Sequence, residues 1–229
     1  MQARERVMTS EEIYRHIKSD IINLKLAPGA FLSENELAKQ YHVSRTPVKA
    51  ALLRLMTEMF VDIEPQRGTY VTKLDLERIR DIIFMRTTLE QELFISASRT
   101  MTGSLLKALK HNLSLQSQLV SGGNFEPHEF YTLDSAFHRT IFEHAGRLKL
   151  WEIIQEFQVY YTRFRMLDII ATSSFPQLVK EHASLLTAIE AGDKSAISTQ
   201  MHTHLNGNLR RLEPRIESEL KEYFLPIGN

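Results

Sequence analysis

Apolar residues recur at helical spacing through the first sixty residues, and short turns divide the pattern. Thr9 and Glu12 form a capping box that opens a first helix, and the Ala-Pro-Gly turn at 27–29 ends it. Ser33 and Glu36 form a second capping box at the start of the next helix. The pattern therefore predicts short helices connected by tight turns.

The stretch 33–54 predicts two helices separated by a turn at 41–43. Ser44 is expected to cap the second helix, and Pro47 suits its first turn, where the missing N–H costs nothing. The outward positions, which are candidate DNA contacts, are Ser44, Arg45, Thr46, Lys49 and Arg54. A helix pair with a basic second helix is typical of a helix-turn-helix DNA reader. An ordinary helical corner with a charged face gives the same spacing.

The residues that follow predict a β-hairpin. Apolar and polar residues alternate over 61–64, Pro-Gln-Arg-Gly at 65–68 is a turn sequence, and 69–72 is a second β-prone run. A hairpin after a helix pair indicates a winged helix-turn-helix. Arg67 and Gly68 at its tip are expected to enter a DNA minor groove, because glycine permits close backbone approach and the groove's negative potential attracts arginine.

Two motifs, VSRTPVKAALLRL at 43–55 and IEPQRGTYV at 63–71, resemble the DNA-binding domain of the GntR family of bacterial transcription regulators. The resemblance spans roughly the first third of the chain and implies double-stranded operator DNA as a partner. Lys49 and Ala50 depart from the family pattern, which usually has Arg and Glu at these positions. Lysine lacks the bidentate fork of arginine, so guanine readout at position 49 is expected to be less tight.

From Asp75 onward the periodicity is helical throughout, with no strand pattern. The predicted helices are 75–100, 104–120, 127–145, 147–171, 176–190 and 193–212, followed by a charged tail after Pro214. The expected fold class is mainly α. We expect a winged helix-turn-helix domain at 1–74 and an all-α bundle at 75–229 that binds metal and effector and forms the dimer.

Composition excludes several kinds of site. The chain has no cysteine, which removes disulfides, thiolate nucleophiles and cysteine-based metal sites. It has no signal-peptide pattern and no apolar run that could span a membrane, so we expect a cytoplasmic protein without a membrane partner. The net charge is zero, and residues 1–74 hold 11 Lys and Arg against 9 Asp and Glu. DNA affinity must therefore come from locally placed cations.

Three helices of the second half carry a polar residue on an otherwise apolar stripe. Helical phase places Asp134 and His138 on one stripe, His182 on a second and His204 on a third. Burying such groups without partners is costly. One aspartate and three histidines in a bundle core suit a divalent transition metal such as zinc, nickel or manganese. The alternative is a set of core histidines that neighbours or water satisfy separately.

Arg86 lies in the middle of the apolar stripe of the helix at 75–100, seven residues from both Ile79 and Leu93. A buried guanidinium group needs an anion. Glu90, one turn later, can supply it internally, or a small carboxylate ligand can supply it as an effector.

Three segments, LDSAFHRTIFEHAG at 133–146, KEHASLLTAIEAGD at 180–193 and MHTHL at 201–205, resemble the FCD effector domain of FadR-type GntR regulators. The matching Asp and three His bind a metal in that family, which implies Asp134, His138, His182 and His204 and leaves His202 outside the set. The resemblance covers nearly all of 75–212, and the six-helix count is that of the VanR-type subgroup. Acyl-CoA-binding members lack the metal set, which argues against that ligand class.

Together these features predict a homodimeric transcription regulator, a repressor whose effector is a small organic acid. The acid would occupy open metal positions and pair with Arg86. A competing hypothesis is a metal-dependent hydrolase tethered to a DNA-binding domain, because such a metal can activate water. No general base beyond the ligands and no nucleophile motif supports it. A third hypothesis is a constitutive DNA-binding protein with a structural metal.

Overall fold

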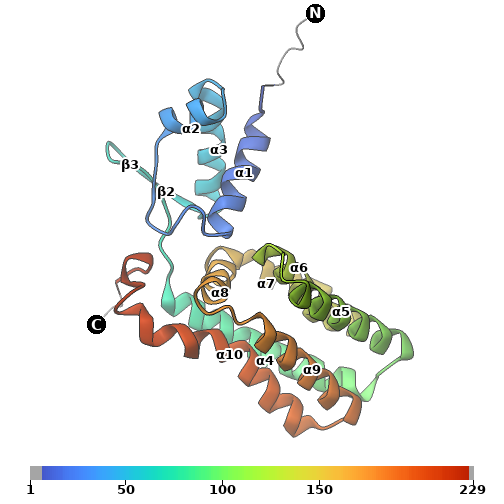
Figure 1. The fold of residues 1–229 in the computed structure, drawn as a ribbon. Helices are drawn as coiled ribbons and strands as arrows, with labels where there is room; N and C mark the ends of the chain where they lie inside the picture. The colour runs from blue at the N-terminus through green and yellow to red at the C-terminus, as the bar shows by residue number, and fades with distance from the viewer. Residues whose placement is uncertain (1–6, 227–229) are drawn as a thin grey trace, which may run out of the picture. The chain divides into compact units, whose positions relative to one another are not determined.

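The computed structural model describes residues 7–226, apart from the side chains of residues 158 and 159. The fold is mainly helical with one small sheet, which confirms the predicted fold class (Figure 1). The described residues form two compact units, one of residues 7–76 with 219–226 and the other of residues 77–218.

The first unit combines α-helices with a three-stranded antiparallel sheet. The α-helices that precede β2 in the chain are α1 (Ser10–Ile22), α2 (Glu34–Gln40) and α3 (Arg45–Thr57). Its strands are β1 (Phe31–Leu32), β2 (Val61–Glu64) and β3 (Gly68–Val71), in the spatial order β1-β3-β2. β2 and β3 form the predicted hairpin, with Val61 opposite Val71 and Glu64 opposite Gly68.

The starts of α1, α2 and α3 lie where the sequence predicts them, but the three capping residues make different numbers of hydrogen bonds. Thr9 and Glu12 form the complete capping box of α1. Ser33 accepts a hydrogen bond from the Glu36 backbone N–H at 3.3 Å. Ser44 occupies the N-cap position of α3, but its hydroxyl makes no capping hydrogen bond. The exposed Ser44 hydroxyl is therefore available to another partner.

The core of the first unit fixes the orientation of α3. The buried residues of α1 and α3 at this contact are Ile13, Ile17, Ile21, Val48, Leu52 and Leu55. Burying one such side chain contributes roughly 1.5–3 kcal/mol, so this stripe determines which face of α3 turns inward. The opposite face, which carries the candidate DNA contacts, is left exposed.

The C-terminal segment belongs to the first unit and not to the helical domain, where the sequence placed it. Leu74 donates its N–H to Tyr223 O at 2.8 Å and accepts from the N–H of Leu225 at 2.9 Å. Leu74 and Phe224 are both buried, and a short 3₁₀ helix, η1 (Lys221–Tyr223), leads into the pairing. This contact joins residues far apart in sequence, so local periodicity carries no sign of it.

The second unit is built from helices only, within the residues described. They are α4 (Leu76–Arg99), α5 (Gly103–Gly122), α6 (Pro127–His144), α7 (Leu148–Glu156), α8 (Gln158–Thr172), α9 (Phe175–Ala191) and α10 (Lys194–Ile216). The single helix predicted at 147–171 is wrong, because the chain breaks at Phe157 into α7 and α8. No glycine or proline marks that break in the sequence. α10 also continues through Pro214 to Ile216, past the predicted helix end at residue 212.

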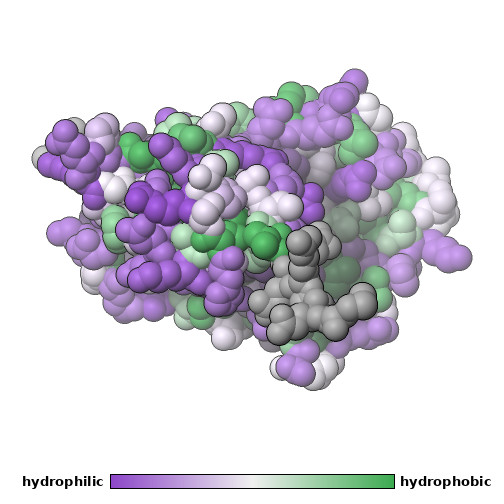
Figure 2. Space-filling model, turned by 90° about the horizontal axis from the view of Figure 1, so that it is seen from above, coloured by the Kyte–Doolittle hydropathy of each residue, from purple (hydrophilic) through white to green (hydrophobic). Residues whose placement is uncertain are grey.

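The interior of the second unit is a shared apolar cluster. Its central members, from α4, α5, α6, α9 and α10, are Phe94, Leu109, Phe137, Ile141, Leu185, Ile197 and Met201. Figure 2 shows that hydrophilic side chains predominate on one face of the molecule, with smaller hydrophobic groups between them. Among residues 7–226 we find no helix with the length and apolarity needed to cross a membrane.

Candidate metal centre and nucleic-acid interface

Four polar side chains from three helices converge inside the second unit. They are Asp134 and His138 on α6, His182 on α9 and His204 on α10. Their potential ligand atoms all lie within 4.8 Å of one another, and none of the four is more than 5% exposed. They meet because each helix turns its apolar stripe into the common core and carries its polar residue there with it.

The three imidazole rings direct their Nε2 atoms at one another. His138 Nε2 lies 3.1 Å from His204 Nε2 and 3.4 Å from His182 Nε2. Asp134 Oδ1 lies 3.5 Å from His182 Nε2. Three nitrogens and one carboxylate oxygen thus surround a common point, and the protonation of the rings decides what that point can hold.

The other ring nitrogen, Nδ1, faces a carboxylate in two of the histidines. His138 Nδ1 lies 2.5 Å from Glu90 Oε2 on α4, and His204 Nδ1 lies 2.9 Å from Glu181 Oε2 on α9. Burial raises the pKa of Glu90, but Arg86 and then His138 outweigh burial and hold it at about 2. An ionised carboxylate can only accept, so Nδ1 of each histidine is the donor.

The third histidine is oriented through a chain of amides. The Leu133 carbonyl can only accept, and it accepts from Asn112 Nδ2 at 3.0 Å. Asn112 Oδ1 then accepts from Gln116 Nε2 at 2.7 Å. This leaves Gln116 Oε1 to accept from His182 Nδ1 at 2.7 Å. His182 is therefore also protonated on Nδ1.

With acceptors facing all three Nδ1 atoms, the Nε2 atoms of the histidines face one another. Burial, followed by the neighbouring His204, lowers the pKa of His182 well below its ordinary value. Burial also lowers the pKa of His138, against the attraction of Glu90. Neutral rings protonated on Nδ1 carry a lone pair on Nε2, so the lone pairs repel unless a cation lies between them. Three imidazole nitrogens and a carboxylate oxygen fit a divalent transition metal.

Asp134 has a second partner that the sequence did not reveal. Arg165 on α8 lies with Nη2 2.5 Å from Asp134 Oδ2, and both side chains are buried. The Arg165 guanidinium also lies 4.4 Å from the ring centre of Tyr131. Burial raises the pKa of Asp134, but Arg165 and the histidines outweigh burial and lower it well below its usual range. Asp134 is therefore ionised and able to bind a cation.

Arg86 finds its anion within the protein. Its Nε donates to Glu90 Oε1 at 2.5 Å, and the other oxygen of the same carboxylate, Oε2, lies 2.5 Å from His138 Nδ1. Burial lowers the pKa of Arg86, but Glu90 outweighs burial and raises it above its ordinary value. This geometry favours the internal partner that the sequence left open, and it gives Arg86 a role in orienting a metal-site histidine.

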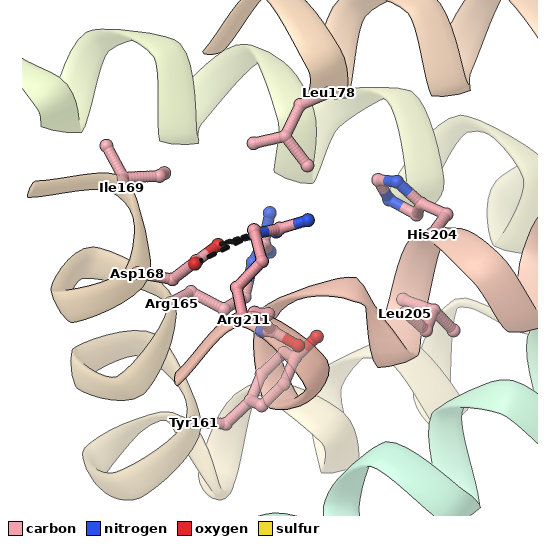
Figure 3. Close-up of a pocket in the computed structure, with 9 residues that line it drawn as sticks. Tyr161, Arg165, Asp168, Ile169, Leu178, His204, Leu205 and Arg211 are labelled. Atoms are coloured by element: carbon pink, nitrogen blue, oxygen red, sulfur yellow. Dashed lines mark hydrogen bonds and ion pairs between the residues drawn. The ribbon is translucent and has the colours of Figure 1, made fainter. Parts of the chain in front are cut away.

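A small pocket adjoins His204 (Figure 3). Its volume is about 10 Å³, enough for roughly one water molecule. Its polar lining residues are Tyr161, Arg165, Asp168, His204, Asn208 and Arg211. Arg211 donates to Asp168 through Nε at 2.9 Å and through Nη2 at 2.6 Å, a bidentate ion pair. Arg86 does not line this pocket.

Only weak sequence signals point to the residues around the ligands. Gln116 follows the buried Leu109 by seven residues on α5, so helical phase could have identified it. Almost every residue of α8 around Arg165 is buried, so this stretch has no solvent-exposed polar face. Helical phase therefore could not show which way the Arg165 side chain points. Outside the ligand set, His202 is exposed, and His144 lies with Nε2 3.1 Å from Thr100 Oγ1.

The candidate DNA contacts occupy the exposed start of α3. Ser44, Arg45, Thr46 and Lys49 are all exposed. Arg45 keeps 65% of its side chain exposed while its Nη2 lies 2.9 Å from Glu34 Oε2 on α2. A pair at this exposure is weak, so DNA phosphates or bases can compete for the guanidinium group.

Arg54 differs from the other candidates on α3, because it is engaged within the first unit. Its guanidinium pairs with Glu11 on α1 and with Glu58, and its Cζ lies 3.7 Å from the ring centre of Tyr14. These contacts account for the side chain without DNA.

The wing presents one accessible cation and one structural glycine. Arg67 is 79% exposed, and its Nη1 lies 3.5 Å from Glu64 Oε2. Gly68 has φ +130°, and an added Cβ would lie only 2.4 Å from Cε2 of Phe31 on β1. The positive φ therefore favours glycine here, and a larger residue would also force the exposed ring of Phe31 to shift; neither effect depends on an approach to DNA.

Both units match known protein families. Residues 9–71 match the bacterial regulatory proteins of the gntR family, and residues 81–207 match the FCD domain. The DNA-binding motifs and all four proposed metal ligands fall inside the matched ranges.

Several regulators resemble the chain over most of its length. The HTH-type transcriptional repressor RspR of Escherichia coli is 29% identical over 86% of this chain and 85% of its own length. An HTH-type transcriptional regulator from an unstable DNA locus of Streptomyces ambofaciens is 31% identical over 93% of this chain and 88% of its own length. The solved structure of E. coli McbR/YncC shares the fold at a TM-score of 0.67 and 22% identity, covering 92% of this chain and 99% of that one. The chain therefore belongs to the GntR family of bacterial transcription regulators with an FCD domain, and it is a DNA-binding regulator, not an enzyme.

Proposed function

We propose that this chain is a metal-dependent repressor, released from operator DNA by a small organic acid that binds beside the metal centre. The observation that carries the proposal is the convergence of three histidine Nε2 atoms, with that of His138 3.1 Å from that of His204 and 3.4 Å from that of His182, while each Nδ1 faces an acceptor of its own. Dedicated acceptors on all three rings are what a metal site requires. Core histidines that were each satisfied by separate partners would have no reason to direct their Nε2 atoms at one point.

Each residue of the site has a distinct task in this proposal. Asp134, His138, His182 and His204 hold zinc, nickel or manganese, and Glu90, Gln116 and Glu181 keep the histidine rings in the ligating tautomer. The bound metal supplies positive charge and open coordination positions for carboxylate oxygens. Arg165 borders both Asp134 and the pocket, so we assign to it the carboxylate contact first expected of Arg86.

Operator binding is assigned to the exposed start of α3 and the wing. Arg45 is the proposed base reader, with Ser44, Thr46 and Lys49 beside it and Arg67 in the minor groove. Arg54 is left out because its guanidinium is already paired. A homodimer on a palindromic operator follows from the usual match between protein and operator symmetry. A monomer in sizing and scattering measurements, bound one to one on DNA, would argue against that dimer.

One pair of variants tests the metal and its role together. His204→Ala removes a proposed ligand, whereas His202→Ala changes the same residue type on the same helix at an exposed position. We expect the first variant to lose bound metal, measured by elemental analysis, and the acid-dependent fall in operator affinity, measured by fluorescence anisotropy. The second variant should keep both. An acid response that persists in metal-free wild-type protein would refute the proposed function.

A further inference from the structure

We infer that the aromatic pair Phe31–Tyr70 positions the tip of the wing, and with it Arg67, for entry into the DNA minor groove. The inference assigns a positioning role to two residues outside the recognition helix. It rests on the proposed function, because that proposal places Arg67 in the groove.

The wing tip, residues 65–67, receives no support from the helices of its own unit. All three residues are exposed, and Figure 1 shows the β2–β3 hairpin projecting away from α1, α2 and α3. The Arg67 side chain lies 3.5 Å from Glu64, but the two side chains are 79% and 47% exposed. A pair at this exposure is weak, so it does not fix the guanidinium group. The tip must therefore take its order from the sheet.

The backbone of the hairpin needs such order, because two residues there have a positive φ. Gln66 has φ +63°, and Gly68 has φ +130°. Glycine adopts such values readily, but a residue with a Cβ pays for them and keeps them only where its surroundings hold them. The Arg67 N–H donates to the Glu64 carbonyl at 3.1 Å. That bond closes the turn, but it does not connect the turn to β1.

The aromatic pair supplies this connection. Phe31 on β1 lies opposite Tyr70 on β3, and their ring centres are 5.4 Å apart with the ring planes tilted by 55°. This separation is typical of favourable aromatic pairs. The Tyr70 hydroxyl donates to the Arg67 carbonyl at 3.3 Å. The Phe31 ring also lies against Gly68, where an added Cβ would be 3.2 Å from Phe31 Cδ2. The pair therefore contacts the tip at two successive residues.

Phe31 is the residue through which β1 reaches the wing. β1 is only two residues long, so it offers one side chain to each face of the sheet. Leu32 is buried in the core, whereas Phe31 is 57% exposed on the outer face. A tip held in place before binding loses less conformational freedom when it meets DNA, so the pair should raise operator affinity. Because the ring is largely exposed, its removal should leave the Tm nearly unchanged.

The order of the free wing tests the inference without DNA. Phe31→Ser removes the ring, whereas Phe31→Tyr keeps it and serves as the conservative control. In full-length protein, the NMR order parameters of the amides of residues 66–68 should lie near the rigid value of about 0.85 in wild type and Phe31→Tyr. They should fall below about 0.6 in Phe31→Ser. Order parameters that stay the same in Phe31→Ser would overturn the inference.

Operator binding tests whether the pair acts through Arg67. The probe is a duplex that the wild-type protein selects from a random-sequence pool. Phe31→Ser should bind it about 3- to 10-fold more weakly, the range expected when a long side chain must be ordered during binding, and Phe31→Tyr should bind it like wild type. Tyr70→Phe, which removes only the bond to the Arg67 carbonyl, should lose about twofold. Wild-type affinity in Tyr70→Phe would overturn the role of that hydroxyl.

A double-mutant cycle separates positioning from a direct contact. In an Arg67→Ala background, Phe31→Ser should cause no further loss of affinity. A loss as large as that in the wild-type background would show that Phe31 contacts DNA itself, and it would overturn the positioning role. Wild-type affinity in Arg67→Ala would overturn the wing contact of the proposed function. If Arg67→Ala weakens binding and Phe31→Ser does not, the inference alone is wrong.

Discussion

Replacing Gln116 with leucine tests whether the metal centre depends on its outer hydrogen bonds. Gln116 is fully buried and accepts from His182 Nδ1 at 2.7 Å. Leucine keeps a similar volume and removes that acceptor, so the His182 ring loses the bond that fixes its tautomer. The proton can then move to Nε2, where it blocks the proposed metal-ligating atom.

The expected size of the effect follows from these contacts. Loss of an outer-shell partner of a ligating histidine typically weakens metal affinity about 10- to 100-fold. In the metal-free protein, His182 Nδ1 loses a buried partner, which costs about 1–3 kcal/mol. A change of about 1 kcal/mol shifts Tm by about 2–4 °C in proteins of this size, so Tm should fall by about 2–12 °C.

Gln118→Leu provides the matched control, because Gln118 lies on the same helix, is exposed and bonds only Ser114 among the described residues. Isothermal titration with zinc or manganese and a thermal melt of chelator-treated protein would be recorded for both variants. Equal metal affinity in wild type and Gln116→Leu would refute the reasoning that the amide chain holds His182 as a ligand.

Three further predictions concern the first unit. Arg45→Ala should cost about 1–3 kcal/mol in operator binding and little on random DNA, measured by anisotropy; an equal loss on both would make Arg45 a phosphate contact. Arg67→Ala should weaken operator binding without changing the melting temperature, because its side chain is 79% exposed, and unchanged affinity would remove the wing from the interface. Glu58→Gln should lower stability by about 1 kcal/mol at pH 7, because the Glu58 carboxylate binds Lys18 and Arg54. Burial raises the pKa of Glu58, but these partners outweigh burial and lower it, so its contribution is present above about pH 4.5 and is lost below it; wild type and variant should converge in melts near pH 3.

Helical periodicity was sufficient to find the four proposed ligands, because each lies on a stripe whose other members are apolar. His182, for example, shares its stripe with Leu178, Leu185 and Ile189, and all four are buried. The same reasoning excluded His202, which is exposed. Which residues share a face of one helix depends only on their spacing in the chain, so a single sequence is enough to show it.

The partners of those ligands depend on how different helices pack, which local phase does not determine. Glu181 directly precedes a ligand in sequence, yet it bonds His204 on another helix. Arg165 reaches Asp134 from α8, a helix too completely buried to show a polar face. The break at Phe157 likewise has no glycine or proline to mark it.

The pairing of Leu74 with residues 223–225 makes the DNA-binding unit discontinuous in sequence. A fragment that stops after residue 76 would lack Phe224 and expose the apolar surface of Leu74, which is fully buried in the whole chain. A chimaera that combines this DNA reader with another effector domain therefore needs two junctions, one near residue 76 and one near residue 218. Exchange at a single junction, the usual route for modular regulators, would separate the reader from its own last segment.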